Sequence, residues 1–367
     1  MNEYQALSRT PLVLELNRVQ RLYTGGSLLD RWQGLPPQGD GVNSEEFLVS
    51  TVEYIGFGHP VENGLSRTRL PGGGYITLRA LIQSDPDAFL GAAYSGLCHG
   101  HSGVLTRVGD SNVRLVIQCH PDREKAQRCF GVPFGKAEAW VIADTRVIGG
   151  VAPHLYCGFR PGVTREHWKE LFLRQDVDGM LACMHRFEIR QGDTILIPAG
   201  MPHAMGSGCL FIEIHEPCDY TIRPERRYLT RELSDEEMHY GLGFDALLDF
   251  FDYTTYTEDE IRQVCFPQAI QEASGSSFTL TSLLRYENTP RFSIRRLELR
   301  GRAALPHFDG HFLLITEHGG VRLFWEGGSC DVPQGRGTFV PAGVCSLEAQ
   351  GDASLLIAYP FDPAQPN

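Results

Sequence analysis

The sequence predicts a mainly β protein that contains two related β-barrels of the jelly-roll type. Three observations support this fold class: many short apolar segments, few helical segments, and an internal repeat. The chain has 367 residues, of which 40 are glycine and 22 are proline. Short strands separated by turn residues favour a sandwich or barrel over alternating strand and helix units.

The internal repeat relates residues 191–217 to residues 334–360 without a gap. Both copies begin with Gln-Gly, contain Pro-Ala-Gly and end with proline. Each copy predicts a strand, a tight turn and a second strand, which together form a hairpin corner of a small barrel. Ser346 occupies in the second copy the position of His203 in the first. A residue needed for the fold should recur, so His203 is a candidate site residue and the second barrel is expected to lack this site.

Helical segments are expected at three places only, between the blocks of strands. One follows residue 84, one begins at Thr164 and one begins at Leu233. Thr164 and Ser234 are expected helix N-caps, because acidic residues follow each of them in the first turn. The helices are therefore expected to be insertions into a β framework.

Composition and charge restrict the classes of partner. The chain is 42% hydrophobic and 21% charged, as in soluble globular proteins. Its formal net charge of -12 argues against nucleic acid or an anionic membrane surface, because both attract basic proteins. No secretory signal or membrane-spanning apolar run is present, and the ten scattered cysteines, without a CxxC pair, indicate reduced thiols. We therefore expect a cytoplasmic protein.

Residues 116–140 place polar side chains within an apolar pattern. If residues 114–120 are extended, Gln118 and His120 point to the same face of the strand. Glu138 and His203 complete a set of two imidazoles, one carboxylate and one amide oxygen, which suits zinc and, less specifically, iron, manganese or cobalt. Such a set leaves a coordination position open, as catalytic sites do. We predict about one Zn2+ per chain at these four residues.

Simpler interpretations of these residues remain open. Gln118 could be an ordinary hydrogen-bonded residue, and His120 a half-buried histidine without a metal. The other histidines in question are expected to be surface or loop residues: His99, His101, His154, His185 and His215.

Four segments resemble, in this order, motifs of the type I mannose-6-phosphate isomerases, which are zinc enzymes of the cupin superfamily: "IQCHPDREKA", "GKAEAW", "ILIPAGMPHAMGSGCLFIEI" and "CDYTIR". Weaker matches lie upstream, in "GGSLLDRW", "EEFLVST", "GGGYITLRALIQSDP" and "VLTRVGD". The resemblance covers roughly residues 20–230. It implies a fold of two cupin-like jelly-roll barrels with a small helical insertion. It also implies a zinc ion at the four residues named above.

The resemblance further implies roles for charged residues. Arg223 would lie near the reacting carbons or the phosphate, and Glu213 would be the proton-transfer base. Lys136 and Arg223 could hold the phosphate or stabilise an enediolate. Arg107, also a candidate for substrate binding, stands where the family typically has a lysine. Val116 stands where the family usually has a serine close to the phosphate.

These assignments predict a zinc-dependent aldose–ketose isomerase that acts on a small-molecule sugar phosphate. The favoured reaction interconverts mannose 6-phosphate and fructose 6-phosphate by proton transfer through an enediol. An isomerase or epimerase of another sugar, including an unphosphorylated one, and a non-isomerase metal-binding cupin remain alternatives. The sequence makes no prediction of oligomeric state. The predicted domain ranges are residues 1–230 for the metal-binding catalytic domain with a helical insertion near 164–186, residues 231–274 for a helical connection, and residues 275–367 for a second cupin-like barrel without metal.

Overall fold

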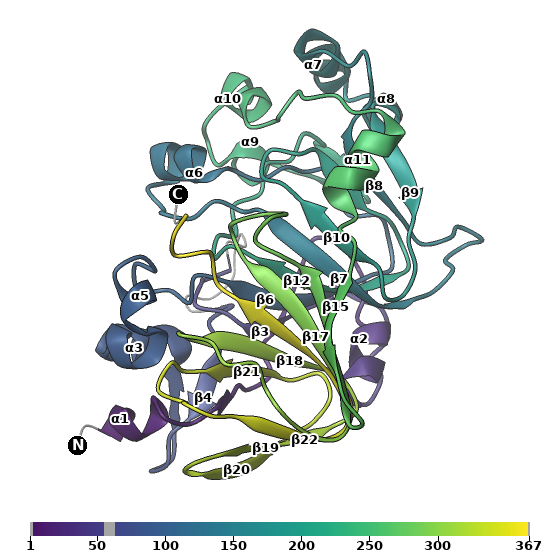
Figure 1. Cartoon of the computed structure of the whole chain (residues 1–367). Helices are drawn as coiled ribbons and strands as arrows, with labels where there is room; N and C mark the ends of the chain where they lie inside the picture. Colours follow the sequence, from purple (N-terminus) through teal and green to yellow (C-terminus); the bar gives the residue numbers. More distant parts are fainter. Residues whose placement is uncertain (1–2, 55–62, 366–367) are drawn as a thin grey trace.

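The fold is built from antiparallel β-sheets, with short helices around them (Figure 1). The computed structural model describes residues 3–54 and 63–365. The strands are β1 Leu12–Val13, β2 Arg18–Val19, β3 Glu45–Val49, β4 Arg67–Arg69, β5 Tyr75–Thr77, β6 Leu105–Ser111, β7 Glu138–Thr145, β8 His154–Phe159, β9 Met184–Glu188, β10 Thr194–Ile197, β11 His203–Met205, β12 Cys209–His215, β13 Arg227–Tyr228, β14 Arg231–Glu232, β15 Ile270–Ser274, β16 Phe278–Leu284, β17 Ser293–Ala304, β18 Phe312–His318, β19 Val321–Trp325, β20 Gly328–Val332, β21 Gly337–Val340 and β22 Glu348–Tyr359. The helices are α1 Glu3–Leu7, α2 Ser27–Trp32, α3 Leu78–Ser84, α4 Pro86–Leu90, α5 Ala92–Ser95, α6 Arg123–Phe130, α7 Arg165–Arg174, α8 Val177–Ala182, α9 Asp235–His239, α10 Phe244–Asp249 and α11 Glu258–Cys265. The predicted mainly β, cupin-like class is confirmed.

Three sheets form the two barrels. The N-terminal barrel combines a six-stranded sheet, in the order β10-β7-β12-β6-β3-β2, with a three-stranded sheet, β11-β8-β9. Its core includes Trp140 and Ile142 of β7 and Phe211 of β12. The C-terminal barrel is a nine-stranded sheet in the order β1-β21-β18-β22-β17-β16-β15, with the β19–β20 hairpin attached to β22. Leu314 and Ile357 belong to its separate core.

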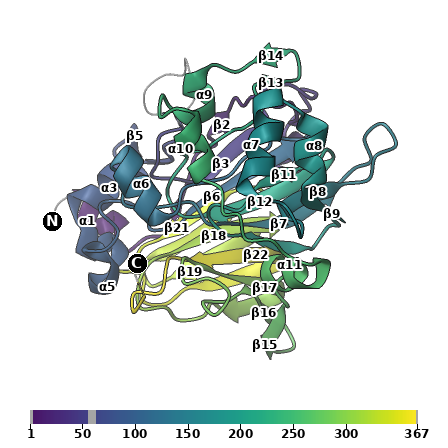
Figure 2. The same cartoon turned by 90° about the horizontal axis from the view of Figure 1, so that it is seen from above.

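A third apolar core joins the two barrels. Val141 and Ile212, which alternate with the residues that face the N-terminal core, pack in this shared core with Leu313 and Leu356 of the C-terminal barrel. Figure 2 shows the yellow and green C-terminal strands lying along the teal strands of the first barrel. Because β12 is covered on both faces, all seven of its residues are buried and the usual alternation of apolar and polar residues is lost.

The internal repeat is real, but its two strands do not form a hairpin. β10 and β12 lie on opposite sides of β7, and β21 and β22 lie on opposite sides of β18. The strand registers of the two copies also agree. Ile197 and Val340 are aligned in the repeat, and they lie opposite Glu138 and Phe312, the first residues of β7 and β18. The predicted hairpin corner was therefore wrong. In each copy, the chain after the Pro-Ala-Gly turn reaches the other side of a central strand, β7 or β18. That central strand lies between the two strands that were expected to pair.

The start of the chain joins the C-terminal barrel. β1 pairs with β21, with Leu12 opposite Phe339 and Val13 opposite Thr338. The predicted domain ranges stay a prediction, but this pairing holds residues near both ends of the chain in one sheet.

The expected helices are present, and further ones occur. Thr164 caps α7 by accepting a hydrogen bond from the His167 N–H, and Ser234 caps α9. Residues 184–186, at the end of the predicted insertion, belong to β9. The prediction missed α6, which Asp122 caps. Over the described residues, no helix combines the length and apolar character needed to cross a membrane.

Replacing Ser234 with alanine should destabilise the protein slightly. The Ser234 hydroxyl accepts from the Glu237 N–H, and the Ser234 N–H donates to the Glu237 carboxylate at 3.0 Å. Loss of such a cap costs about 1 kcal/mol. For a chain of this size, we expect the melting temperature to fall by about 1 to 2 °C, measured by calorimetry. Ser234→Thr should keep most of the stability, and an equal loss in both variants would contradict a capping role.

Candidate metal centre and active site

Two strand starts and one extended segment bring the predicted ligands together. Glu138 is the first residue of β7, and His203 is the first residue of β11. The His203 N–H donates to the Gln118 carbonyl at 2.9 Å, and the Gln118 N–H donates to the His203 carbonyl at 3.0 Å. His120 follows two residues later. The segment predicted as a strand forms only isolated bridges, at Gln118 and Cys119, but these are sufficient to fix its position beside β11.

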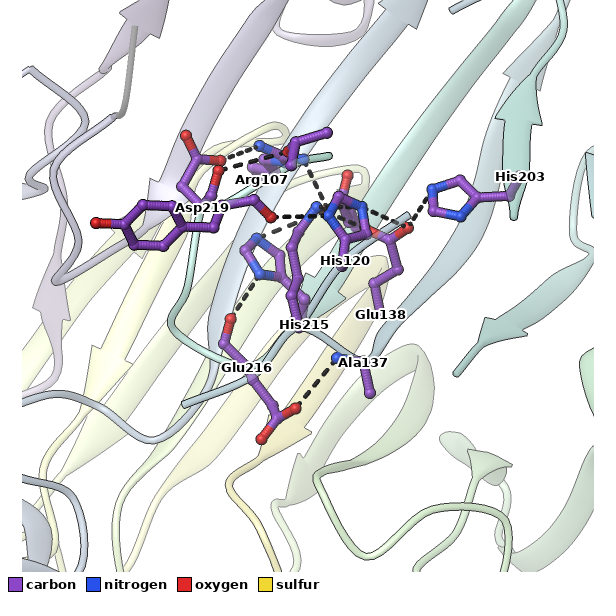
Figure 3. Close-up of polar contacts among 12 residues, drawn as sticks. Arg107, His120, Ala137, Glu138, His203, His215, Glu216 and Asp219 are labelled. Carbon is purple, nitrogen blue, oxygen red and sulfur yellow. Dashed lines mark hydrogen bonds and ion pairs between the residues drawn. The ribbon is translucent and has the colours of Figure 1, made fainter. Parts of the chain in front are cut away.

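His120, Glu138 and His203 form a compact buried cluster. One potential ligand atom from each lies within 4.8 Å of the others. The Nε2 atoms of His203 and His120 lie 3.0 and 3.4 Å from Oε1 of Glu138. Figure 3 shows the three side chains directed toward one another. None is more than 1% exposed, so this cluster is not a set of surface residues.

The two imidazoles are oriented in the way that metal ligands are. Nδ1 of His203 lies 2.9 Å from the Met201 carbonyl, and Nδ1 of His120 lies 3.0 Å from the Tyr220 carbonyl. A hydrogen bond from each Nδ1–H to its carbonyl leaves both Nε2 lone pairs facing the Glu138 carboxylate. Among the described residues, Nε2 of His203 and Oε1 of Glu138 have no hydrogen-bond partner, so these acceptors can take a cation. The donor chemistry therefore fits a divalent metal.

Electrostatics at the cluster favour the forms that bind a metal. Burial, reinforced by the Lys136 ammonium, lowers the pKa of His120 to about 3, so the imidazole is neutral. Burial by itself would raise the pKa of Glu138. Lys136 and the two imidazoles outweigh this effect and hold the pKa of Glu138 well below its usual range. The carboxylate is therefore ionised.

Lys136 lies between the cluster and Glu213. The Lys136 side chain is fully buried, and its Nζ lies 2.8 Å from Oε2 of Glu138 and 3.2 Å from Oε1 of Glu213. It also lies 3.1 Å from Nε2 of His120. Lys136 thus connects the candidate metal ligands with the predicted proton carrier.

A cavity adjoins this cluster inside the N-terminal barrel. Gln118, Val116, Glu213, Arg107 and Arg223 are among its lining residues, so the structure brings five predicted or discussed positions to one space. Glu213 points inward because it shares a face of β12 with the core residue Phe211. Burial raises the pKa of Glu213, against the opposing effects of Arg107 and Lys136. The open alternative of a surface carboxylate is excluded, because Glu213 is buried.

Arg107 is surrounded by carboxylates. Its Nη2 donates to Oε1 of Glu213 at 2.8 Å, and its Nη1 donates to Oδ1 of Asp219 at 3.0 Å. Oε2 of Glu45 lies 3.4 Å away. The guanidinium is therefore neutralised by neighbouring charges, and its clearest effect is to hold Glu213 in place. A direct role of Arg107 in substrate binding stays a prediction.

Arg223 differs from Arg107 in its partners. Its Nη1 donates to the carbonyls of Thr221 and Glu237 at 3.1 and 2.8 Å. Among the residues that the structure describes, its Nε–H has no hydrogen-bond partner and no carboxylate forms an ion pair with it. Backbone carbonyls thus orient a cation at the cavity wall while leaving its charge uncompensated.

Several residues of this site were not predicted. Glu45 accepts a hydrogen bond from the Tyr23 hydroxyl at 2.7 Å and forms an ion pair with Arg21. Glu45 and Asp219 lie within quoted motifs, but nothing in a single sequence distinguishes their carboxylates from exposed ones. The expectation for His215 was wrong, because it is fully buried with Nε2 3.7 Å from Glu213. His154 and His185 are buried as well.

The sequence is similar to those of known mannose-6-phosphate isomerases. It is 29% identical over 259 residues to the mannose-6-phosphate isomerase ManA of Bacillus subtilis, a match that covers 70% of this chain and 74% of the relative. It is 25% identical over 257 residues to the "Probable mannose-6-phosphate isomerase GmuF" of the same organism, covering 70% and 75%. The chain is therefore similar in sequence to mannose-6-phosphate isomerases over about 70% of its length. No family model matches the chain.

Solved structures named as mannose-6-phosphate isomerases share the fold over both barrels. The enzyme from Bacillus subtilis superposes with a TM-score of 0.73 at 19% identity, covering 95% of this chain and 99% of that one. A variant of the phosphomannose isomerase from Salmonella typhimurium gives a TM-score of 0.72 at 14% identity, covering 96% and 100%. The likeness in fold therefore extends beyond the motif segments into the C-terminal barrel.

Proposed function

We propose that this protein is a zinc-dependent isomerase that interconverts mannose 6-phosphate and fructose 6-phosphate. One observation carries the proposal: two imidazoles and Glu138 converge beside a cavity whose wall contains Glu213 and Arg223. The sequence similarity to mannose-6-phosphate isomerases supports the same reaction class. The substrate class is a small sugar phosphate, and the site lies within a single chain.

The donor set supports one zinc ion per chain. His120, Glu138 and His203 would hold it, and Gln118, which is paired with His203 through the backbone, would be the fourth ligand. When bound, the cation supplies Lewis acid chemistry, because it stabilises negative charge that develops on a sugar oxygen.

Glu213 would carry the proton. It would take the proton from C2 of the open-chain aldose, and the electron pair of that bond would form the C1–C2 double bond, moving negative charge to O1. A proton then passes from O2 to O1, and Glu213 returns its proton to C1, which leaves the ketone at C2. Arg223 would stabilise the charge on oxygen, because no carboxylate among the described residues neutralises it. Lys136 and Arg107 would position the Glu213 carboxylate.

An unphosphorylated sugar is the second candidate substrate. Val116 lines the cavity and offers no hydroxyl to a phosphate. Arg107 and Arg21 also line it, but both already contact the carboxylates of Glu45 and Asp219. The cavity wall therefore has fewer unpaired cationic side chains than a phosphate dianion prefers.

The test is a panel of aldoses and their 6-phosphates, each offered to zinc-loaded protein in D2O. NMR follows the exchange of the C2 proton and the appearance of the ketose. Turnover of mannose 6-phosphate is the expected result. Exchange with mannose alone would support the second candidate, and a protein that exchanges no aldose would rule out an isomerase.

Replacing Val116 with serine should favour the phosphorylated substrate. A hydroxyl that donates to a charged group contributes about 1.5 to 3 kcal/mol, which corresponds to one or two powers of ten in affinity. We expect kcat/KM for mannose 6-phosphate to rise by about tenfold, while the value for mannose stays nearly unchanged. Val116→Ala, which adds no hydroxyl, is the control. Equal changes for both sugars would place the phosphate elsewhere.

We also propose a cytoplasmic location. All ten cysteines are unpaired thiols, and most of them are buried. A reducing compartment preserves thiols in this state.

A further inference from the structure

The C-terminal barrel contains a cavity of its own. It has a volume of about 380 Å³ and lies between the end of β17, the start of β18, the β19–β20 hairpin and the segment that leads into β22. Figure 1 shows this hairpin at the lower end of the molecule. The volume is within the range of small-molecule sites, which begins at roughly 300 Å³.

This cavity corresponds to the metal centre of the N-terminal barrel. Phe312 is the first residue of β18 as Glu138 is of β7, and their partners Val340 and Ile197 are equivalent in the repeat. Phe312 lines the cavity. An aromatic ring therefore replaces the carboxylate ligand.

Apolar residues also line the part of the cavity that corresponds to the surroundings of Gln118 and His203. The Leu305 N–H donates to the Leu347 carbonyl at 2.9 Å, which matches the bond from the Gln118 N–H to the His203 carbonyl. Both leucines line the cavity. Leu347 is one residue beyond Ser346, which the sequence alignment had placed opposite His203. Leu305 and Leu347 thus line the cavity beside Ser346, and a leucine side chain offers no ligand to a metal.

Aromatic rings form much of the wall. Phe308, Phe312, Phe324 and Trp325 all line the cavity. Glu326 and Gly327 form the two-residue turn of the β19–β20 hairpin. This turn packs closely against Trp325, since a Cβ atom at Gly327 would lie 3.0 Å from the indole nitrogen. Trp325 is half-buried, so part of its ring remains available to a ligand.

Charged residues surround these rings without a surplus of positive charge. Nε of Arg302 donates to Oε2 of Glu348 at 2.7 Å, so the two charges offset each other. Glu326 adds a further negative charge, while His307 contacts Asp309 at 2.9 Å. The lining therefore offers hydrogen-bond donors and acceptors to hydroxyl groups but does not attract an anion.

We propose that this cavity binds a neutral monosaccharide. The C–H face of the sugar ring would lie against Trp325 and the neighbouring phenylalanines, and its hydroxyls would bond to Arg302, Glu348 and Glu326. The site is separate from the metal centre, and the proposal does not depend on the isomerase reaction.

Cys345 and Trp325 make the proposal measurable. Cys345 lines the cavity and is the exposed one of the ten cysteines. Trp325 is half-buried, whereas the other three tryptophans are at most 6% exposed. Mannose added to the zinc-loaded full-length protein should shield Trp325 from iodide quenching. It should also slow alkylation of Cys345, by about tenfold at ten times its Kd. Mannose 6-phosphate should protect much less.

Two variants locate the protection. Ala304→Phe fills the cavity and should abolish protection while leaving isomerase activity unchanged, whereas Gln350→Phe, on an exposed strand position outside the cavity, should preserve protection. His203→Ala should also preserve it. The proposal is overturned if no neutral hexose protects, if the phosphate protects equally, if Ala304→Phe retains protection, or if His203→Ala loses it. Because Ala304→Phe should keep its isomerase activity, loss of protection in this variant tests the cavity separately from the proposed isomerase function.

Discussion

Replacing His203 with alanine is expected to remove the metal and nearly all activity. His203 is completely buried, and its Nε2 faces Glu138 at 3.0 Å. Metal stabilisation of an oxyanion contributes several kcal/mol, and a loss of about 4 kcal/mol lowers kcat/KM by about 10³-fold. We expect elemental analysis to find little zinc in the purified variant. Circular dichroism should show an intact β fold.

His154→Ala is the matched control. His154 is also buried, and its Nδ1 lies 2.8 Å from the carbonyl of Ala152, as Nδ1 of His203 lies beside that of Met201. Both histidines belong to the three-stranded sheet, at facing strands β8 and β11. The control should keep its zinc and its activity. Full zinc occupancy in His203→Ala would show that the metal is held elsewhere.

The sequence predicted the candidate ligands because each has a local signal. Strand alternation placed Gln118 and His120 on one face, and the repeat distinguished His203 from residues needed by the fold. The predicted strand around Gln118 is little more than two bridges, yet the alternation still holds because the backbone is extended there. The error in secondary structure did not affect the prediction that His120, Glu138 and His203 lie together, and the four-ligand metal site stays a prediction.

The partners of charged residues could not be predicted in this way. Arg107 was expected to face substrate, but it contacts Glu213, Asp219 and Glu45, which lie far from it in the chain. His215 was taken for a surface or loop residue because its neighbours in sequence are mixed, with Ile214 before it and Glu216 after it. His215 is buried because β12 packs between two cores, and the local sequence pattern does not predict that packing.

The repeat gave the correct relation between the barrels and a wrong local geometry. The repeat predicted a hairpin, whereas β7 lies between β10 and β12, and β18 lies between β21 and β22. The sequence had predicted a second barrel without the metal site, and Ser346, Leu305 and Leu347 all line its cavity.

Replacing Glu213 with glutamine should abolish proton transfer and leave the metal bound. Glutamine has nearly the same shape, so it can still accept bonds from Arg107 and Lys136, but it cannot take a proton from carbon. General base catalysis contributes about 10² to 10⁴-fold, and we expect kcat to fall by about 10³-fold. NMR in D2O should detect almost no exchange of the C2 proton. Elemental analysis should still find one zinc per chain.

Glu317→Gln separates this chemical effect from the loss of a buried charge. Glu317 is also a buried glutamate held by an arginine, with its two oxygens 2.8 and 2.9 Å from Arg296, but it lies in the C-terminal barrel. It should therefore keep the wild-type exchange rate, even if its melting temperature falls. Proton exchange that survives in Glu213→Gln would assign the base to another group. His215, fully buried and 3.7 Å from Glu213, would then be the next residue to replace.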